Sequence, residues 1–144
     1  MLVDANILLY AVDSASPHHE VASAWLTEKL NGRRPVGIPW ESLMAYLRIA
    51  THPRALANPS APEVAWADVR RWLDCDVVWT PTPTARHAEI LGELVGRHGP
   101  RGNLLPDAHL AALAIEHGLT VCSADTDFAR FTEVEWVNPL AAPR

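Results

Sequence analysis

The sequence predicts a three-layer α/β/α domain with a mostly parallel central sheet of about five strands. Short apolar runs alternate with longer segments of helical periodicity along the 144 residues. Strands that alternate with helices favour a parallel sheet covered on both faces. Hydrophobic residues make up 49% of the chain and charged residues 20%, which excludes a disordered protein. No internal repeat or long linker divides the chain, so we expect one domain over residues 1–144.

Short apolar runs bounded by turn residues or charges mark the strands. The first run opens the chain and ends at Asp4, and the later runs are rich in Val, Ile and Trp. We therefore expect strands at residues 1–4, 36–38, 77–79 and 119–122, with a possible fifth at 134–137.

The helices are predicted from apolar residues at helical spacing. Gly99 and Gly118 are typical stop signals at helix ends. Trp66 shares an apolar stripe with Val69, so we expect Trp66, like Trp79 in the third strand, to lie in the core or over the sheet. The predicted helices are residues 7–12, 18–30, 41–50, 63–74, 85–97 and 106–117.

Carboxylates recur where strands end. Asp4 ends the first strand, Glu41 closely follows the second, and Asp125 and Asp127 follow the fourth. In open parallel sheets, ligands bind at the carboxyl ends of the strands, so these acids should share one edge. Asp107 lies in the first turn of the last helix and reaches that edge only if the helix begins near it. Each acid taken alone also fits a helix cap, a first helical turn or a loop turn.

Carboxylates that converge repel one another and require a cation, and a divalent metal with oxygen ligands is the simplest candidate. The net charge is −5, and setting aside Asp4, Glu41, Asp107 and Asp125 leaves −1. This balance weakens the case for a broad basic surface but leaves room for a local one. None of the seven histidines has the spacing of a zinc protease, and His109, two residues after Asp107, should point elsewhere on its helix.

Four segments in this order resemble a known family: Val3-Asp4-Ala5-Asn6-Ile7, Pro39-Trp40-Glu41, Pro106-Asp107-Ala108-His109 and Ser123-Ala124-Asp125-Thr126-Asp127-Phe128. Together they resemble PIN-domain endoribonucleases, and within that family the VapC toxins of VapBC toxin–antitoxin pairs, of a branch abundant in mycobacteria. The resemblance covers nearly the whole chain.

The resemblance implies a role for each acid. It implies that Asp4, Glu41, Asp107 and Asp125 form the metal site and are catalytic, with Asp127 as an auxiliary acid. Asn6 and Ser123 match polar positions that orient carboxylates, although many relatives carry Ser or Thr where this chain has Asn6.

The implied activity is Mg²⁺- or Mn²⁺-dependent hydrolysis of RNA phosphodiester bonds by a metal-activated water, leaving a 5′-phosphate and a 3′-hydroxyl. The resemblance also implies a homodimer, a VapB-like antitoxin and a role as the toxin of a type II toxin–antitoxin system. Candidate RNA contacts are Arg48, on the same helix face as Glu41, and Arg97 and Arg101 beside a Gly/Pro-rich loop. Neither a signal peptide nor a membrane span is visible, so a cytoplasmic location is expected.

Two other functions remain open on the sequence. One is a catalytically silent PIN-like module that binds RNA or protein through an acidic pocket. The other is a phosphatase related to haloacid dehalogenases, which also begins with an Asp at a strand end. That family needs a second Asp two residues later, where this chain has Asn6. Titration with a divalent metal distinguishes the first of these from a nuclease, because only the nuclease must bind the metal.

Overall fold

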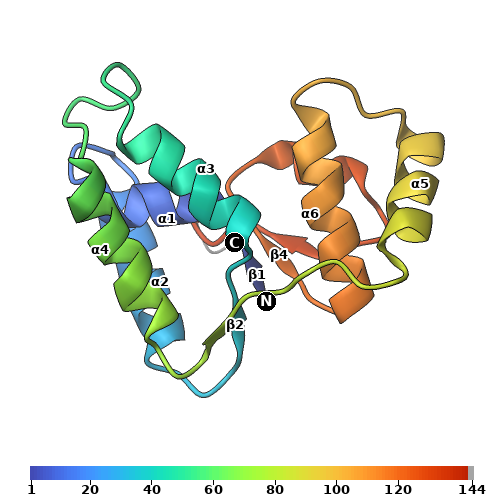
Figure 1. Cartoon of the computed structure of the whole chain (residues 1–144), viewed down its shortest axis with the longest axis horizontal. Helices are drawn as coiled ribbons and strands as arrows, with labels where there is room; N and C mark the ends of the chain where they lie inside the picture. The colour runs from blue at the N-terminus through green and yellow to red at the C-terminus, as the bar shows by residue number, and fades with distance from the viewer. Residues whose placement is uncertain (143–144) are drawn as a thin grey trace.

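The computed structural model describes residues 1–142 and has a sheet of five parallel strands at its centre (Figure 1). The strand order is β3-β2-β1-β4-β5, so the chain starts in the middle of the sheet. The predicted fold class is confirmed, and each strand falls within a predicted apolar run. The strands are β1 Leu2–Val3, β2 Val36–Gly37, β3 Val78–Trp79, β4 Val121–Cys122 and β5 Trp136–Val137.

Helices cover both faces of this sheet (Figure 1). Successive residues of a strand point to opposite faces, and β1 shows the consequence. Leu2 packs into a core formed mainly by α5 and α6, whereas Val3 packs into a second core formed by α1 to α4. The helices are α1 Ala5–Val12, α2 His19–Leu30, α3 Trp40–Ala50, α4 Pro62–Leu73, α5 His87–His98 and α6 Leu104–His117, with a short 3-10 helix η1 at Thr126–Arg130.

The predicted helix ends agree with the structure to within two residues. Gly99 and Gly118 end α5 and α6 in the left-handed conformation, with φ of 56° and 65°. The one shift that bears on the site is at α6, which begins at Leu104 rather than Pro106. Pro106 is tolerated there because amide groups of the first helical turn have no partner within the helix. None of the helices in residues 1–142 is long and apolar enough to cross a membrane.

The position expected for Trp66 is wrong. Its residue surface is 44% exposed, because the buried stripe of α4 runs through Asp68 and Val69 instead. Asp68 is buried because the hydroxyl of Tyr46 donates to its Oδ2 over 2.8 Å and Arg71 pairs with its Oδ1. Because an acidic residue, Asp68, lies within the buried stripe of α4, apolar spacing alone did not identify which face of the helix is buried.

Strand register determines which site residues become neighbours. Val3 pairs with Cys122 across the parallel β1–β4 ladder, so the next residues, Asp4 and Ser123, leave the sheet side by side. Asp4 donates its backbone amide to the carbonyl of Cys122 over 3.0 Å, which extends the ladder by one bond. The carboxyl ends of the two central strands therefore present the first polar residues of the site at one edge.

Candidate metal centre

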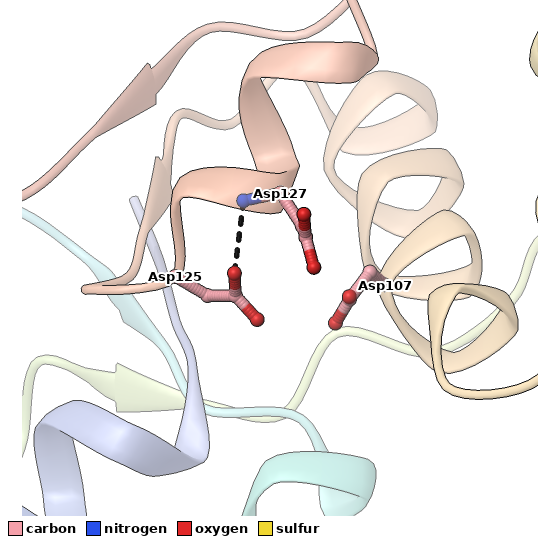
Figure 2. A group of neighbouring side chains, drawn as sticks. All are labelled: Asp107, Asp125 and Asp127. Carbon is pink, nitrogen blue, oxygen red and sulfur yellow. Dashed lines mark hydrogen bonds between the residues drawn. The ribbon is translucent and has the colours of Figure 1, made fainter.

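Three carboxylates from two segments converge at this edge (Figure 2). Asp107 points from the first turn of α6 toward Asp125 and Asp127, which lie at the start of η1. One carboxylate oxygen from each lies within 4.8 Å of the other two. Asp125 also caps η1, since its Oδ1 accepts from the amide of Asp127 over 2.8 Å. The Asp125 side chain therefore caps η1 and also belongs to the carboxylate cluster.

Asp4 lies next to this cluster and is held by three donors. Its Oδ1 accepts from the amide of Ala5 over 2.7 Å, as expected of a residue that caps α1. Its Oδ2 accepts from Ser123 Oγ over 2.7 Å and from Asn6 Nδ2 over 3.1 Å. Burial raises the pKa of Asp4, and the charge of Asp125 adds to this, whereas the bonds from Ser123 and Ala5 oppose it.

Asn6 and Ser123 join the first strand exit to the fourth. The amide of Asn6 donates to Ser123 Oγ over 2.9 Å, and its Oδ1 accepts from the backbone of Ala124 over 3.1 Å. Ser123 Oγ in turn accepts from the amide of Asp125 over 3.0 Å. Ser123 is fully buried, so these contacts are shielded from water. Both residues therefore have the contacts of groups that orient neighbouring carboxylates.

The surroundings of Asp107 disfavour its ionised form. Burial, followed by the charges of Asp125, Asp4 and Asp127, raises the pKa of Asp107 to about 6. The carboxyl therefore binds its proton more tightly than an ordinary aspartic acid does. A divalent cation would oppose this shift, because its charge favours the ionised form of each carboxylate near it. The donor set contains only carboxylate oxygens, which suits Mg²⁺ or Mn²⁺.

Glu41 lies outside the group of three converging carboxylates. It occupies the first turn of α3, and its Oε1 contacts Nε2 of His109 over 2.9 Å. Asp107 and His109 do point in different directions, as their spacing on α6 predicts, but His109 faces another acid of the predicted site. Sequence reasoning missed this contact because it joins residues 68 positions apart, and no local spacing signals it.

The three candidate RNA contacts differ in their surroundings. Arg97 forms an ion pair with Glu133, in which Nη1 of Arg97 lies 2.5 Å from Oε1 of Glu133. Arg48 lines a shallow pocket with His52 and Arg54 at the carboxyl end of α3. Arg101 is exposed in the loop that joins α5 to α6. Within residues 1–142, neither Arg48 nor Arg101 forms an ion pair, so their charges stay available to a phosphate.

Known proteins share both this sequence pattern and this fold. The PIN domain family matches residues 1–134. Ribonuclease VapC37 of Mycobacterium tuberculosis (strain ATCC 25618 / H37Rv) is 43% identical over 140 residues, covering 97% of this chain and 97% of the relative. VapC20 of Mycobacterium tuberculosis, whose structure is described as that of a sarcin-ricin loop cleaving toxin, has a TM-score of 0.69 at 20% identity and covers 93% of this chain and 96% of its own. DNA-bound VapBC from Salmonella typhimurium has a TM-score of 0.66 at 21% identity, with 96% of each chain covered.

Proposed function

The chain belongs to the PIN-domain family and, within it, to the VapC ribonucleases, and on this premise we propose that it is a metal-dependent endoribonuclease and the toxin of a type II toxin–antitoxin system. The observation that carries the proposal is the convergence of Asp107, Asp125 and Asp127 within 4.8 Å of one another, beside Asp4. Carboxylates arranged in this way hold a divalent ion in place at the edge where an RNA phosphate can approach.

We assign Asp4, Glu41, Asp107 and Asp125 to the metal site, and the geometry supports an equal role for Asp127. Mg²⁺ or Mn²⁺ is the cofactor that this oxygen donor set fits. When bound, such an ion lowers the pKa of a coordinated water and offsets the charge that develops on the attacked phosphate.

The other residues act by orientation. Ser123 and Asn6 both hold Oδ2 of Asp4, and the amide of Asp127 fixes Asp125. The scissile phosphate meets these oxygens at the carboxyl ends of β1 and β4, while Arg48 and Arg101 bind phosphates further along the RNA strand. Carboxylates that are already held in position need not move when RNA hydrolysis proceeds. Their fixed orientation therefore lowers the activation barrier of the reaction.

A VapB-like antitoxin and a second copy of this chain are the proposed protein partners. The VapBC assembly from Salmonella typhimurium contains a chain of the same fold and supports the antitoxin assignment. The cytoplasm, where RNA substrates and an antitoxin are both present, is the proposed location.

The test incubates purified protein with total RNA in Mg²⁺ and in EDTA, and maps the ends of the fragments. The expected result is cleavage only with Mg²⁺, leaving 5′-phosphates. Asp4→Asn and Asp107→Asn should abolish cleavage, while the exposed Asp76→Asn should retain it. Equal cleavage by all variants would refute the assignment. RNA or protein binding without cleavage by the wild type would favour the catalytically silent module instead.

A further inference from the structure

A hydrogen-bonded chain of four side chains leads from Glu41 into the protein. Glu41 Oε1 contacts His109 Nε2 over 2.9 Å, and His109 Nδ1 contacts His87 Nε2 over 2.9 Å. His87 Nδ1 then contacts Glu116 Oε2 over 2.8 Å. The two imidazole rings meet edge to face with centroids 4.8 Å apart. We call these four residues the Glu41–Glu116 relay.

Burial increases steadily along the relay. The exposed fraction of the side chain is 39% for Glu41, 26% for His109, 13% for His87 and 0% for Glu116. The inner end is also the more constrained, because Glu116 Oε1 accepts from the backbone amide of Thr84 over 2.7 Å. The relay is therefore anchored in the protein at one end and reaches the partly exposed side chain of Glu41 at the other.

The two ends of the relay determine how the rings are oriented. An ionised Glu116 only accepts hydrogen bonds, so His87 must present a hydrogen on Nδ1. For the same reason Glu41 requires a hydrogen on Nε2 of His109. The contact between His87 Nε2 and His109 Nδ1 needs one further hydrogen, so one of the two rings carries a hydrogen on both of its nitrogens. The partner of one ring nitrogen fixes the orientation of the ring and hence the direction in which its other nitrogen points. His87 and Glu116 thus hold His109 in the one orientation that faces Glu41.

Glu41 needs such support because of its position. It stands in the first turn of α3, which packs on one face of the sheet, whereas His109, His87 and Glu116 belong to α5 and α6 on the other. In the described residues, His109 is its one hydrogen-bonded side-chain partner. A glutamate side chain loses rotamer freedom when it is held in one position, so a hydrogen-bonded partner is needed to offset that cost.

We propose that His109 positions Glu41 at the edge of the metal centre, with His87 and Glu116 acting as positioning residues that fix the His109 ring. This inference rests on the proposed function, since it takes Glu41 to be part of the nuclease site. Partners of this outer kind typically change activity by about 10–100-fold when removed.

The first measurement detects the relay without any substrate. In ¹⁵N spectra of histidine side chains, His87 Nδ1 and His109 Nε2 should show imidazole N–H signals protected from exchange with water. His87→Phe keeps an edge-to-face aromatic contact but removes both hydrogen bonds, so the His109 signal should be lost. The carboxyl ¹³C resonance of Glu41 should shift in the same variant.

The second measurement is RNA cleavage at saturating Mg²⁺. We expect His87→Phe and His109→Phe to lower kcat about tenfold while KM changes less than about twofold. Glu116→Gln should stay within about threefold of wild type, because a glutamine can accept from Thr84 and donate to His87 Nδ1. His87 Nε2 can then donate to His109 Nδ1, and His109 Nε2 still donates to Glu41. Glu116→Ala should resemble His87→Phe.

His117→Phe is the matched control. This histidine lies on the same helix, contacts the carbonyl of Thr82 over 2.7 Å and packs edge to face on Trp79 at 5.3 Å, but has no bond to the relay. It should leave kcat and the Glu41 resonance unchanged. Melting temperatures of all variants identify any that fail to fold.

Absence of the protected N–H signals in the wild type would overturn the relay, whatever the activity. A wild-type kcat in folded His87→Phe and His109→Phe would overturn the positioning role. If the wild type cleaves no RNA, the proposed function fails, and the positioning of Glu41 is still decided by its ¹³C resonance. A shift in His87→Phe but not in His117→Phe upholds the inference, and no shift refutes it.

Discussion

Ser123 donates its hydroxyl hydrogen to Oδ2 of Asp4 across 2.7 Å, although the two residues are 119 positions apart in the chain. The bond follows from strand register, because β1 and β4 pair in parallel with Val3 opposite Cys122. A one-residue slip of either strand would turn one partner toward the other face of the sheet. The central strand pair therefore sets the geometry of the site as well as the core.

Removing the hydroxyl of Ser123 should weaken the site without unfolding the protein. In Ser123→Ala, Asp4 loses one of its donors, and we expect the Mg²⁺ concentration for half-maximal RNA cleavage to rise about tenfold. Ser42→Ala is a suitable control, because the hydroxyl of Ser42 is also buried but has no hydrogen-bond partner in the described residues. Equal Mg²⁺ dependence in both variants would show that Ser123 does not orient Asp4.

Asp107→Asn should stabilise the metal-free protein above about pH 6. The pKa of Asp107 is raised from 3.8 to about 6, so between these values the folded state holds more protons than the unfolded state. The free energy of unfolding then falls as pH rises through this window, and the loss persists above it. The shift corresponds to about 3 kcal/mol, which solvent screening of a half-buried group reduces to about 1–2 kcal/mol.

Thermal melting in EDTA measures this effect. Asp107→Asn and wild type should have nearly equal melting temperatures at pH 4. By pH 7 the melting temperature of Asp107→Asn should exceed that of wild type by several degrees. The exposed Asp76→Asn serves as the control and should show no such trend. A difference in melting temperature between Asp107→Asn and wild type that does not change with pH would contradict the raised pKa of Asp107.

The arginines should differ in their effect on RNA affinity. Arg97 is already paired with Glu133, whereas Arg48 and Arg101 are not paired in the described residues. We expect Arg48→Ala and Arg101→Ala each to weaken RNA binding several-fold. Each should also lower, by about one, the slope of the logarithm of the binding constant against the logarithm of salt concentration. Arg97→Ala should have a smaller effect on both quantities. Binding of a fluorescent RNA to a cleavage-deficient Asp107→Asn background, measured over a range of salt, tests this. A larger loss of RNA affinity in Arg97→Ala than in Arg48→Ala and Arg101→Ala would contradict this prediction.

Tyr46→Phe should destabilise the fold and leave the site intact. The Tyr46 hydroxyl satisfies the buried Asp68, and burial together with this bond raises the pKa of Tyr46. Loss of a donor to a buried carboxylate costs about 1–3 kcal/mol. Urea unfolding should show this loss, while Tyr10→Phe, whose hydroxyl has no hydrogen bond in the described residues, should change stability little. Reduced cleavage by folded Tyr46→Phe would argue against this separation of core and site.

Local patterns were enough to predict the alternation of strands and helices and the edge at which the acids gather. Asp4 and Asp125 follow strands that are neighbours in the sheet, so their approach depends only on parallel topology. The approach of Asp107 depends in addition on where α6 begins. The structure starts that helix at Leu104 and brings Asp107 to Asp125 and Asp127.

Long-range side-chain contacts could not be predicted in this way. The bond between Glu41 and His109 depends on how α3 and α6 approach each other from opposite faces of the sheet. The burial of Asp68 depends on a hydroxyl 22 positions away, and it displaced Trp66 from the expected stripe. In each case a polar partner distant in sequence decides the outcome, and apolar periodicity carries no signal for it.

The convergence of carboxylates on a divalent ion is tested most directly by calorimetric titration of Mn²⁺ into the metal-free protein. We expect saturable binding to the wild type near neutral pH, and binding weakened at least about tenfold in Asp107→Asn and Asp125→Asn. Asp76→Asn should bind as the wild type does. If the wild type takes up no Mn²⁺, or if Asp107→Asn and Asp125→Asn bind it as tightly, these acids do not form a metal centre.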